Sequence, residues 1–287
     1  MKSSLEPQRY LFKFYYIGTN KFHGSQRQIN DFTIEQCLLD ALIQKKYIKN
    51  VKLSGFEVAS RTDKYVSARG AAFSFISLKK PILMELNSIL PNEVGLWAYS
   101  KVEQNFSSRF NSVYRHYKYI VHLPINFLER DLKKNLNLEI INKAFKKLEG
   151  KHNFKNFMKR EKVVKKTIRD ILSASVMIKN DYLIFDFKSK AFLRQQIRRM
   201  VKKLLELGTG MIDYSDFLDL FDPLKEISYQ PADPTGLILW DIKFSNDIIF
   251  QIEPKSVERM MKYFLKQKLK FGHKHQLFEV LHQDNLS

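Results

Sequence analysis

Strand-like apolar runs alternate with amphipathic helical stretches, and the chain contains two successive rounds of this alternation. In the first round, residues 10–16 and 70–76 have strand patterns, and Thr33–Lys46 has a single apolar stripe typical of a helix. A second helix pattern covers 81–90 and a further strand covers 96–102, so the first half is predicted as β-α-β-α-β. This order is typical of mixed α/β architecture.

The second round begins at Asn105. Its predicted elements are strands, a hairpin and helices over 108–121, 138–148, 171–178, 182–188, 191–207 and 237–244. In the helix predicted over Ala191–Leu207, Arg194, Arg198 and Lys202 follow one another at i, i+4 and i+8. We therefore predict an N-terminal half over 1–104, a C-terminal half over 105–246 and a basic helical extension over 247–287.

The charge balance limits the kinds of partner. Among 287 residues, 49 Lys and Arg face 30 Asp and Glu, a formal net charge of +19. Such a surplus implies an anionic partner, most simply nucleic acid, with an anionic membrane surface as the competing interpretation. No apolar run approaches the ~20 residues that span a bilayer, and the N-terminus does not resemble a signal peptide. A single cysteine, Cys37, excludes an internal disulfide and fits a reducing cytoplasm.

Two segments concentrate the positive charge. The first, 151–169, carries aromatic residues among its cations, and its predicted phosphate contacts are Lys151, Lys155, Lys159, Lys165 and Lys166. The second, 254–287, has the pattern of a basic amphipathic helix, which either contacts RNA or packs on the domain. Its two nearby histidines, His273 and His275, are too few for a metal site.

Asp63 is the candidate catalytic carboxylate. It lies between Arg61 and Lys64, directly before the strand 70–76, so a rigid element holds it while it stays open to a cleft. The two cations would favour its ionised form and attract a phosphate-bearing substrate. On chemistry alone, a turn aspartate in a solvated charged loop is the commoner interpretation.

Five stretches of the chain resemble the motifs of the TruA-type tRNA pseudouridine synthases, and they follow one another along residues 10–244 in the family's order. The signature loop is Arg61-Thr62-Asp63 followed by Val66-Ser67-Ala68. The other four stretches are Tyr16–Gln28, Ser108–Tyr119, Phe192–Arg198 and Pro231–Leu239. Three residues depart from the family pattern: Ile17 in place of Asp, Ser25 in place of Trp or Phe, and Tyr65 in place of Gly.

The resemblance implies a fold, a reaction and an assembly. It implies an α/β fold whose two similar RRM- or ferredoxin-like halves join their antiparallel sheets around a central cleft. It also implies a cytoplasmic homodimer that grips tRNA and isomerises uridine to pseudouridine, in the region of the anticodon stem-loop. Because this reaction neither oxidises nor adds a group, no redox cofactor and no metal is expected.

The resemblance also assigns roles to individual residues. Asp63 is the catalytic group, Arg198 pairs with it, Tyr117 packs against the uracil, and Arg61 holds the flipped nucleotide or its phosphate. Lys64 is an expected contact of the RNA backbone. Without the resemblance, Tyr117 would be taken as a core aromatic. Two other classes of function compete: a non-catalytic RNA chaperone with RRM-like sheets, and a peripheral membrane protein.

Overall fold

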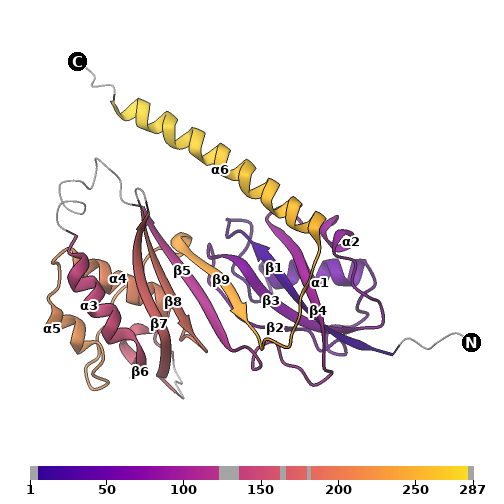
Figure 1. Cartoon of the computed structure of the whole chain (residues 1–287), viewed down its shortest axis with the longest axis horizontal. Coiled ribbons are helices and arrows are strands. Elements are labelled where there is room, and N and C mark those ends of the chain that lie inside the picture. The colour runs from indigo at the N-terminus through magenta and orange to yellow at the C-terminus, as the bar shows by residue number, and fades with distance from the viewer. Residues whose placement is uncertain (1–5, 123–135, 162–165, 180–181, 284–287) are drawn as a thin grey trace, which may run out of the picture.

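The computed structural model describes residues 6–122, 136–161, 166–179 and 182–283 (Figure 1). The described strands form one ten-stranded sheet in the order β10-β4-β1-β3-β9-β5-β8-β7-β6, with β2 paired to β3. The strands are β1 (Gln8–Tyr16), β2 (Glu57–Val58), β3 (Ser67–Ser77), β4 (Val94–Val102), β5 (Tyr114–His122), β6 (Gly150–Asn153), β7 (Ile168–Lys179), β8 (Tyr182–Ser189), β9 (Leu237–Lys243) and β10 (Gln251–Ile252). The helices are α1 (Ile34–Gln44), α2 (Leu83–Asn87), α3 (Leu138–Leu148), α4 (Gln196–Gly208), α5 (Tyr214–Asp219) and α6 (Pro254–Gln283), with short 3₁₀ turns at Lys155–Phe157 and Pro234–Gly236.

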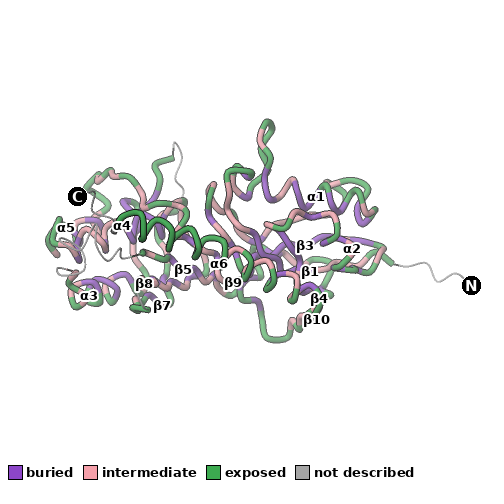
Figure 2. Tube along the Cα trace, turned by 90° about the horizontal axis from the view of Figure 1, so that it is seen from above, coloured by how far each residue is buried: buried purple, intermediate pink, exposed green. Residues whose placement is uncertain are grey.

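One parallel pairing joins the two halves of the sheet. Ser67 and Ala68 of β3 lie opposite Ile238 and Leu239 of β9, and the other described pairings are antiparallel. The predicted α/β class with a mostly antiparallel sheet is confirmed. The likeness of each half to an RRM stays a prediction, as does the predicted division into three domains. Figure 2 shows the last strand, β10, beside β4 of the N-terminal half, with which it pairs.

Strand β1 is covered on both faces and contributes to a hydrophobic core that continues into the C-terminal half. Leu11 to Tyr16 are all buried, because α1 covers one face and the start of α6 with the preceding loop covers the other. The side chain of Thr33 caps α1 by accepting a hydrogen bond from the backbone N–H of Gln36, as its sequence predicts. Cys37 lies in this core, and burial raises the pKa of its thiol to about 12.

The strand predicted over 108–121 begins six residues later, at Tyr114. The carboxylate of Glu57 accepts hydrogen bonds from the hydroxyls of Ser107 and Ser108 and from the N–H of Arg109. Of these donors, the Arg109 N–H is a backbone group that a strand would pair along its ladder. The segment turns instead, and the N–H of Asn111 donates to the carbonyl of Ser107 at 3.0 Å. The helix predicted over 81–90 is likewise shorter, Leu83–Asn87.

The predicted start of the helix over Ala191–Leu207 was also wrong. Gln195 has φ of +62° and α4 begins at Gln196, whose side chain accepts from the N–H of Leu193 at 2.7 Å. Phe192 continues the apolar pattern but packs edge-on against Tyr117 in a loop. Arg194 is therefore not on the helix, and the predicted row with Arg198 and Lys202 does not exist.

The sheet of the C-terminal half is covered on one face only. Along β5 and β8 the buried residues alternate with more exposed ones (Figure 2). Arg115, Tyr117 and Tyr119 lie on the covered face, whereas His116 and Lys118 lie on the open one. In the described part of the chain, no helix is long and apolar enough to cross a membrane.

Candidate active site

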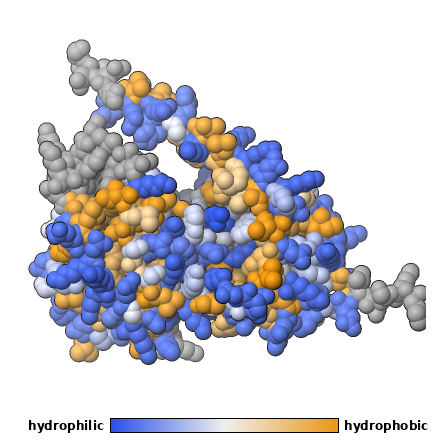
Figure 3. All heavy atoms as spheres, viewed as in Figure 1, coloured by the Kyte–Doolittle hydropathy of each residue, from blue (hydrophilic) through white to orange (hydrophobic). Residues whose placement is uncertain are grey.

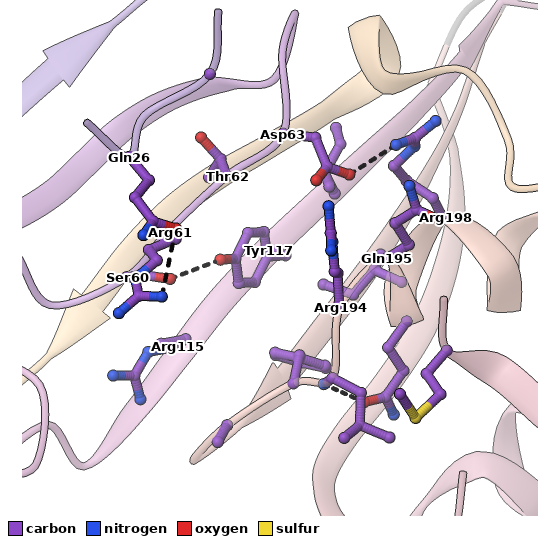
Figure 4. A pocket seen from close by; sticks show the side chains of 18 of the residues that line it. Gln26, Ser60, Arg61, Thr62, Asp63, Arg115, Tyr117, Arg194, Gln195 and Arg198 are labelled. Carbon is purple, nitrogen blue, oxygen red and sulfur yellow. Dashed lines mark hydrogen bonds and ion pairs between the residues drawn. The ribbon is translucent and has the colours of Figure 1, made fainter. Parts of the chain in front are cut away.

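A cleft of about 1040 Å³ opens where the two halves meet, on the covered face of the sheet (Figure 4). Its lining combines the β2–β3 loop, the 23–28 loop, β5 and the start of α4. Cations outnumber acids in this lining: Asp63 and Glu161 face Arg27, Arg61, Lys64, Arg109, Arg115, Lys166, Arg169, Arg194 and Arg198. Such a cleft attracts a polyanion and holds its phosphates.

Asp63 and Arg198 meet inside this cleft, although 135 residues separate them. Arg198 Nη1 donates to Asp63 Oδ2 at 2.7 Å, and Arg198 Nε donates to the carbonyl of Ala232 at 2.7 Å. The side chain of Arg198 is 10% exposed and that of Asp63 is 31% exposed. Asp63 Oδ1 has no hydrogen-bond partner among the described residues. The pair thus presents one oriented carboxylate oxygen that a substrate can reach.

The 17–28 loop holds the loop that carries Asp63. Ser25 Oγ accepts from the N–H of Thr62 at 2.7 Å, and its own N–H donates to the Thr62 carbonyl at 3.2 Å. The hydroxyls of Tyr16 and Thr62 are 2.7 Å apart. A Cβ on Gly18 would come within 2.2 Å of the backbone of Tyr65, so only glycine allows the two loops to approach this closely. Ser25, a departure from the family pattern, is therefore a support of the Asp63 loop.

Tyr65 adopts the backbone conformation that a glycine would provide. Its φ of +69° is in the left-handed region, which a bulky side chain rarely occupies. The Nζ of Lys64 lies 5.1 Å from the centroid of its ring, and Tyr65 remains partly exposed. The turn therefore keeps the shape expected of glycine, at a cost of about 1–2 kcal/mol in backbone energy.

Tyr117 belongs both to the core and to the cleft. It comes from β5, is only 6% exposed and packs edge-on against Phe192 at 5.4 Å between centroids. Its hydroxyl lies 3.0 Å from the hydroxyl of Ser60 (Figure 4). Burial raises the pKa of Tyr117, so the phenol stays protonated at neutral pH. The ring forms part of the cleft wall beside Asp63.

The predicted RNA contacts lie in different places. Arg61, at the other side of Tyr117 from Asp63, donates to Gln26 Oε1 at 3.3 Å (Figure 4). Lys64 and Lys166 line the cleft, whereas Lys155 is turned to Glu226 at 3.3 Å. Lys151 and Lys159 are exposed and do not line the cleft, and Lys165 lies outside the described residues. The aromatic residues of this segment, Phe154 and Phe157, are fully buried and belong to the core.

Arg115 is a site residue to which the sequence interpretation gave no role. It is 8% exposed, and it donates to the carbonyls of Ala59 at 2.6 Å, Arg109 at 2.9 Å and Lys190. These bonds tie β5 to the start of the Asp63 loop and to the segment before α4. Burial lowers the pKa of its guanidinium. A charged residue on the same face as Tyr117 and Tyr119 was the signal that could have identified it.

Within the described ranges, no group of three or more His, Cys, Asp or Glu side chains gathers in a way that could hold a metal ion. The neighbourhood of Asp63 instead offers one carboxylate, several guanidinium groups and an aromatic ring. This set of groups suits proton transfer or nucleophilic attack on a phosphate-bearing substrate with a planar base.

Comparisons with known proteins agree with this chemistry. A family model described as tRNA pseudouridine synthase matches residues 144–245. A tRNA pseudouridine synthase A of Methanosphaera stadtmanae is 35% identical over 263 residues, which cover 91% of this chain and 92% of that protein. The protein of the same name from Archaeoglobus fulgidus is 30% identical over 280 residues, with 97% and 99% coverage. The chain therefore belongs to the family of TruA-type tRNA pseudouridine synthases.

Proposed function

We propose that the protein isomerises uridine to pseudouridine in tRNA and that Asp63 is its catalytic carboxylate. The supporting observation is the Asp63–Arg198 pair, 2.7 Å long and only partly exposed in a cleft lined by cations. Arg198 keeps Asp63 ionised and oriented through a charge-assisted hydrogen bond, while the other carboxylate oxygen is left for the substrate.

The reaction consumes no second substrate, because it only rearranges the bonds of the uridine. The C1′–N1 bond breaks, the uracil turns over, and a C1′–C5 bond forms; the proton on C5 passes to solvent and N1 gains one. One carboxylate serves either as nucleophile at the sugar or the base, or as the base that takes a sugar proton. Because the target base is stacked within the tRNA, it must flip into the cleft, where Tyr117 stacks on the uracil and Arg61 binds the nucleotide's phosphate.

The remaining parts of the proposal concern the substrate region and the assembly. We place the target uridine in the anticodon stem-loop region and the enzyme in the cytoplasm as a homodimer. Lys64 and Lys166 are the proposed backbone contacts at the cleft, Lys151, Lys155 and Lys159 are proposed contacts outside it, and Lys165 is a further proposed contact. The alternative is an RNA chaperone, which would use the same cations and aromatics. It has no use for a carboxylate held by a buried arginine.

The purified protein is expected to release tritium from tRNA labelled with [5-³H]uridine, because C5 loses its hydrogen during isomerisation. Mapping pseudouridines in tRNA from cells with and without the gene then identifies the position, which we expect in the anticodon stem-loop region. Salt-sensitive binding of tRNA without any tritium release would favour the chaperone instead. A modified position in another arm of the tRNA would contradict only the proposed region.

Tyr117→Leu is expected to lower kcat/KM by about 5- to 150-fold, the equivalent of the 1–3 kcal/mol that base stacking contributes. Because Tyr117 is buried, an alanine there would also leave a cavity that costs about 3–5 kcal/mol, so leucine is the better probe. Tyr117→Phe is the matched control: it keeps the ring, loses the contact with Ser60, and should stay within about fivefold of wild-type activity. A leucine variant that melts earlier yet turns over normally would make Tyr117 a core residue alone.

A further inference from the structure

Helix α6 lies outside the segment that the family model matches and is mostly exposed to solvent. Its first turns are anchored on the N-terminal half: Arg259 donates to the carbonyls of Leu90 at 3.2 Å and Val94 at 3.3 Å, and Met260 is buried. From Lys268 to His282 all its side chains are exposed. Figure 3 shows the helix standing off the body, with an opening beneath it. At 30 residues it is about 45 Å long.

The helix runs along a row of strand ends, at the end of the sheet where the Asp63 loop enters β3. Strand registers place Val94, Tyr16 and Ala68 side by side in this row, followed by the first residues of β9 and the last residues of β5. Helix α6 contacts both ends of this row. Its Arg259 donates to the carbonyl of Val94, and the ring of its His275 lies 5.7 Å from the ring of His122 between centroids. It therefore runs from one half to the other past the side of the cleft on which Asp63 lies (Figure 1).

Lysines form a continuous row along α6. Lys262, Lys266, Lys270 and Lys274 follow at i, i+4, i+8 and i+12, with a rise of about 6 Å per step. Within the described residues, Lys262 pairs with Glu258 at 2.7 Å and the other three have no carboxylate partner. Like charges at this spacing destabilise a helix by about 0.2–0.5 kcal/mol per pair. A bound polyanion would remove that cost.

We propose that α6 is a second tRNA-binding surface, on which Lys266, Lys270 and Lys274 contact phosphates of the RNA where it leaves the cleft. This inference rests on the proposed function, because it takes tRNA as the molecule that occupies the cleft. A row of cations without carboxylate partners suits the phosphates of one RNA strand, each of which it can neutralise. The surface binds the backbone and therefore contributes affinity for tRNA as a whole and not the choice of base.

Charge argues against a second copy of this helix as the partner of α6, and the distribution of its apolar residues argues against a membrane. Over α6, seven Lys and Arg face two Glu, so a second copy of this helix would meet a surface of the same sign. A helix that lies on a bilayer needs its apolar residues on one face. The exposed apolar residues of α6 are spread around it: Leu269 and Phe278, for example, are nine positions and so about 180° apart.

The test compares two triple charge reversals in the full-length protein. Lys266→Glu/Lys270→Glu/Lys274→Glu is expected to weaken tRNA binding at least about tenfold at moderate salt and to flatten the plot of log affinity against log salt by roughly three units. Single-turnover kcat at saturating tRNA should change less than about twofold, since Asp63 is untouched. The matched control, Lys49→Glu/Lys52→Glu/Lys80→Glu, changes the net charge equally on exposed residues at the far end of the N-terminal half. It should weaken binding much less.

Several outcomes would overturn the proposal while leaving the enzyme active. Equal losses in both triple variants would reduce the effect to net charge alone. Unchanged affinity in the α6 variant would exclude the contact.

Flotation of the wild-type protein with anionic vesicles in the presence of excess tRNA would make the helix a membrane element. A change of oligomeric state in the α6 variant, measured by light scattering, would make it a contact between subunits. Failure of wild-type protein to release tritium would contradict the proposed function instead.

Discussion

Asp63→Asn is expected to abolish tritium release, by at least ~10⁴-fold, while tRNA binding is nearly unchanged. Asparagine is close to isosteric with aspartate, and its amide oxygen can still accept the hydrogen bond of Arg198 that now ends on Oδ2. The hydrogen bonds between Ser25 and Thr62 that hold the loop do not involve the carboxylate. What the variant lacks is a group able to act as nucleophile or base.

Binding of tRNA by this variant should be equal to that of wild type or slightly tighter. Removal of one negative charge from a cleft lined by cations reduces repulsion of phosphates. Filter-binding titration measures this beside the tritium assay. Asp186→Asn is the matched control: Asp186 also lies 2.7 Å from a basic partner, His116, but on the open face of the sheet away from the cleft. It should retain normal release.

Two results would contradict this assignment. Normal tritium release by Asp63→Asn would exclude Asp63 as the catalytic group. Loss of binding together with loss of release would identify Asp63 as a structural residue, whose substitution leaves the buried Arg198 without its charged partner. Circular dichroism and thermal melting distinguish the second result from simple misfolding.

The order of strands and helices could be predicted because it depends on local patterns. Tyr10–Tyr16 and Thr33–Lys46 carry their periodicity within a few residues, and both predictions are close to the observed β1 and α1. The pairing that joins the halves could not be predicted in this way. The contact of Ser67 with Ile238 is non-local and leaves no periodic signal in either segment.

The errors at element boundaries have specific physical causes that a hydrophobic pattern does not contain. Phe192 and Leu193 extend the apolar stripe of α4, but a positive φ at Gln195 separates them from it. Likewise, Glu57 turns the backbone of residues 107–109 from fifty residues away. In both cases a single side chain or backbone angle decided the boundary.

The candidate site was found by resemblance and not by spacing. Nothing in the sequence alone joins Asp63 to Arg198, and Asp63 taken by itself was better explained as a charge in a solvated loop. The structure brings them to 2.7 Å and leaves Arg194 at the surface, 3.7 Å from Glu161. For Arg115 the pattern could have indicated burial, but not its partners, because these are backbone carbonyls, which carry no residue-specific signal.

Arg198→Met is expected to lower single-turnover kcat by about 10- to 150-fold, which corresponds to the 1.5–3 kcal/mol of a hydrogen bond to a charged group. Methionine fills similar space but can neither orient Asp63 nor donate to Ala232. Arg198→Lys should recover only part of the rate. A guanidinium holds both acceptors at once through Nε and Nη1, whereas an ammonium group is a point charge without this fixed geometry.

Arg194→Met is the matched control for the Arg198 variants. It removes the same charge from the same cleft, but Arg194 is 53% exposed and only loosely paired with Glu161. Its loss should therefore raise the Kd for tRNA modestly and leave single-turnover kcat at saturating tRNA unchanged. Arg198→Met should show the opposite division, with kcat lowered more than affinity. If both variants weaken binding alike and both keep the wild-type kcat, Arg198 is a phosphate contact and does not orient the catalytic carboxylate.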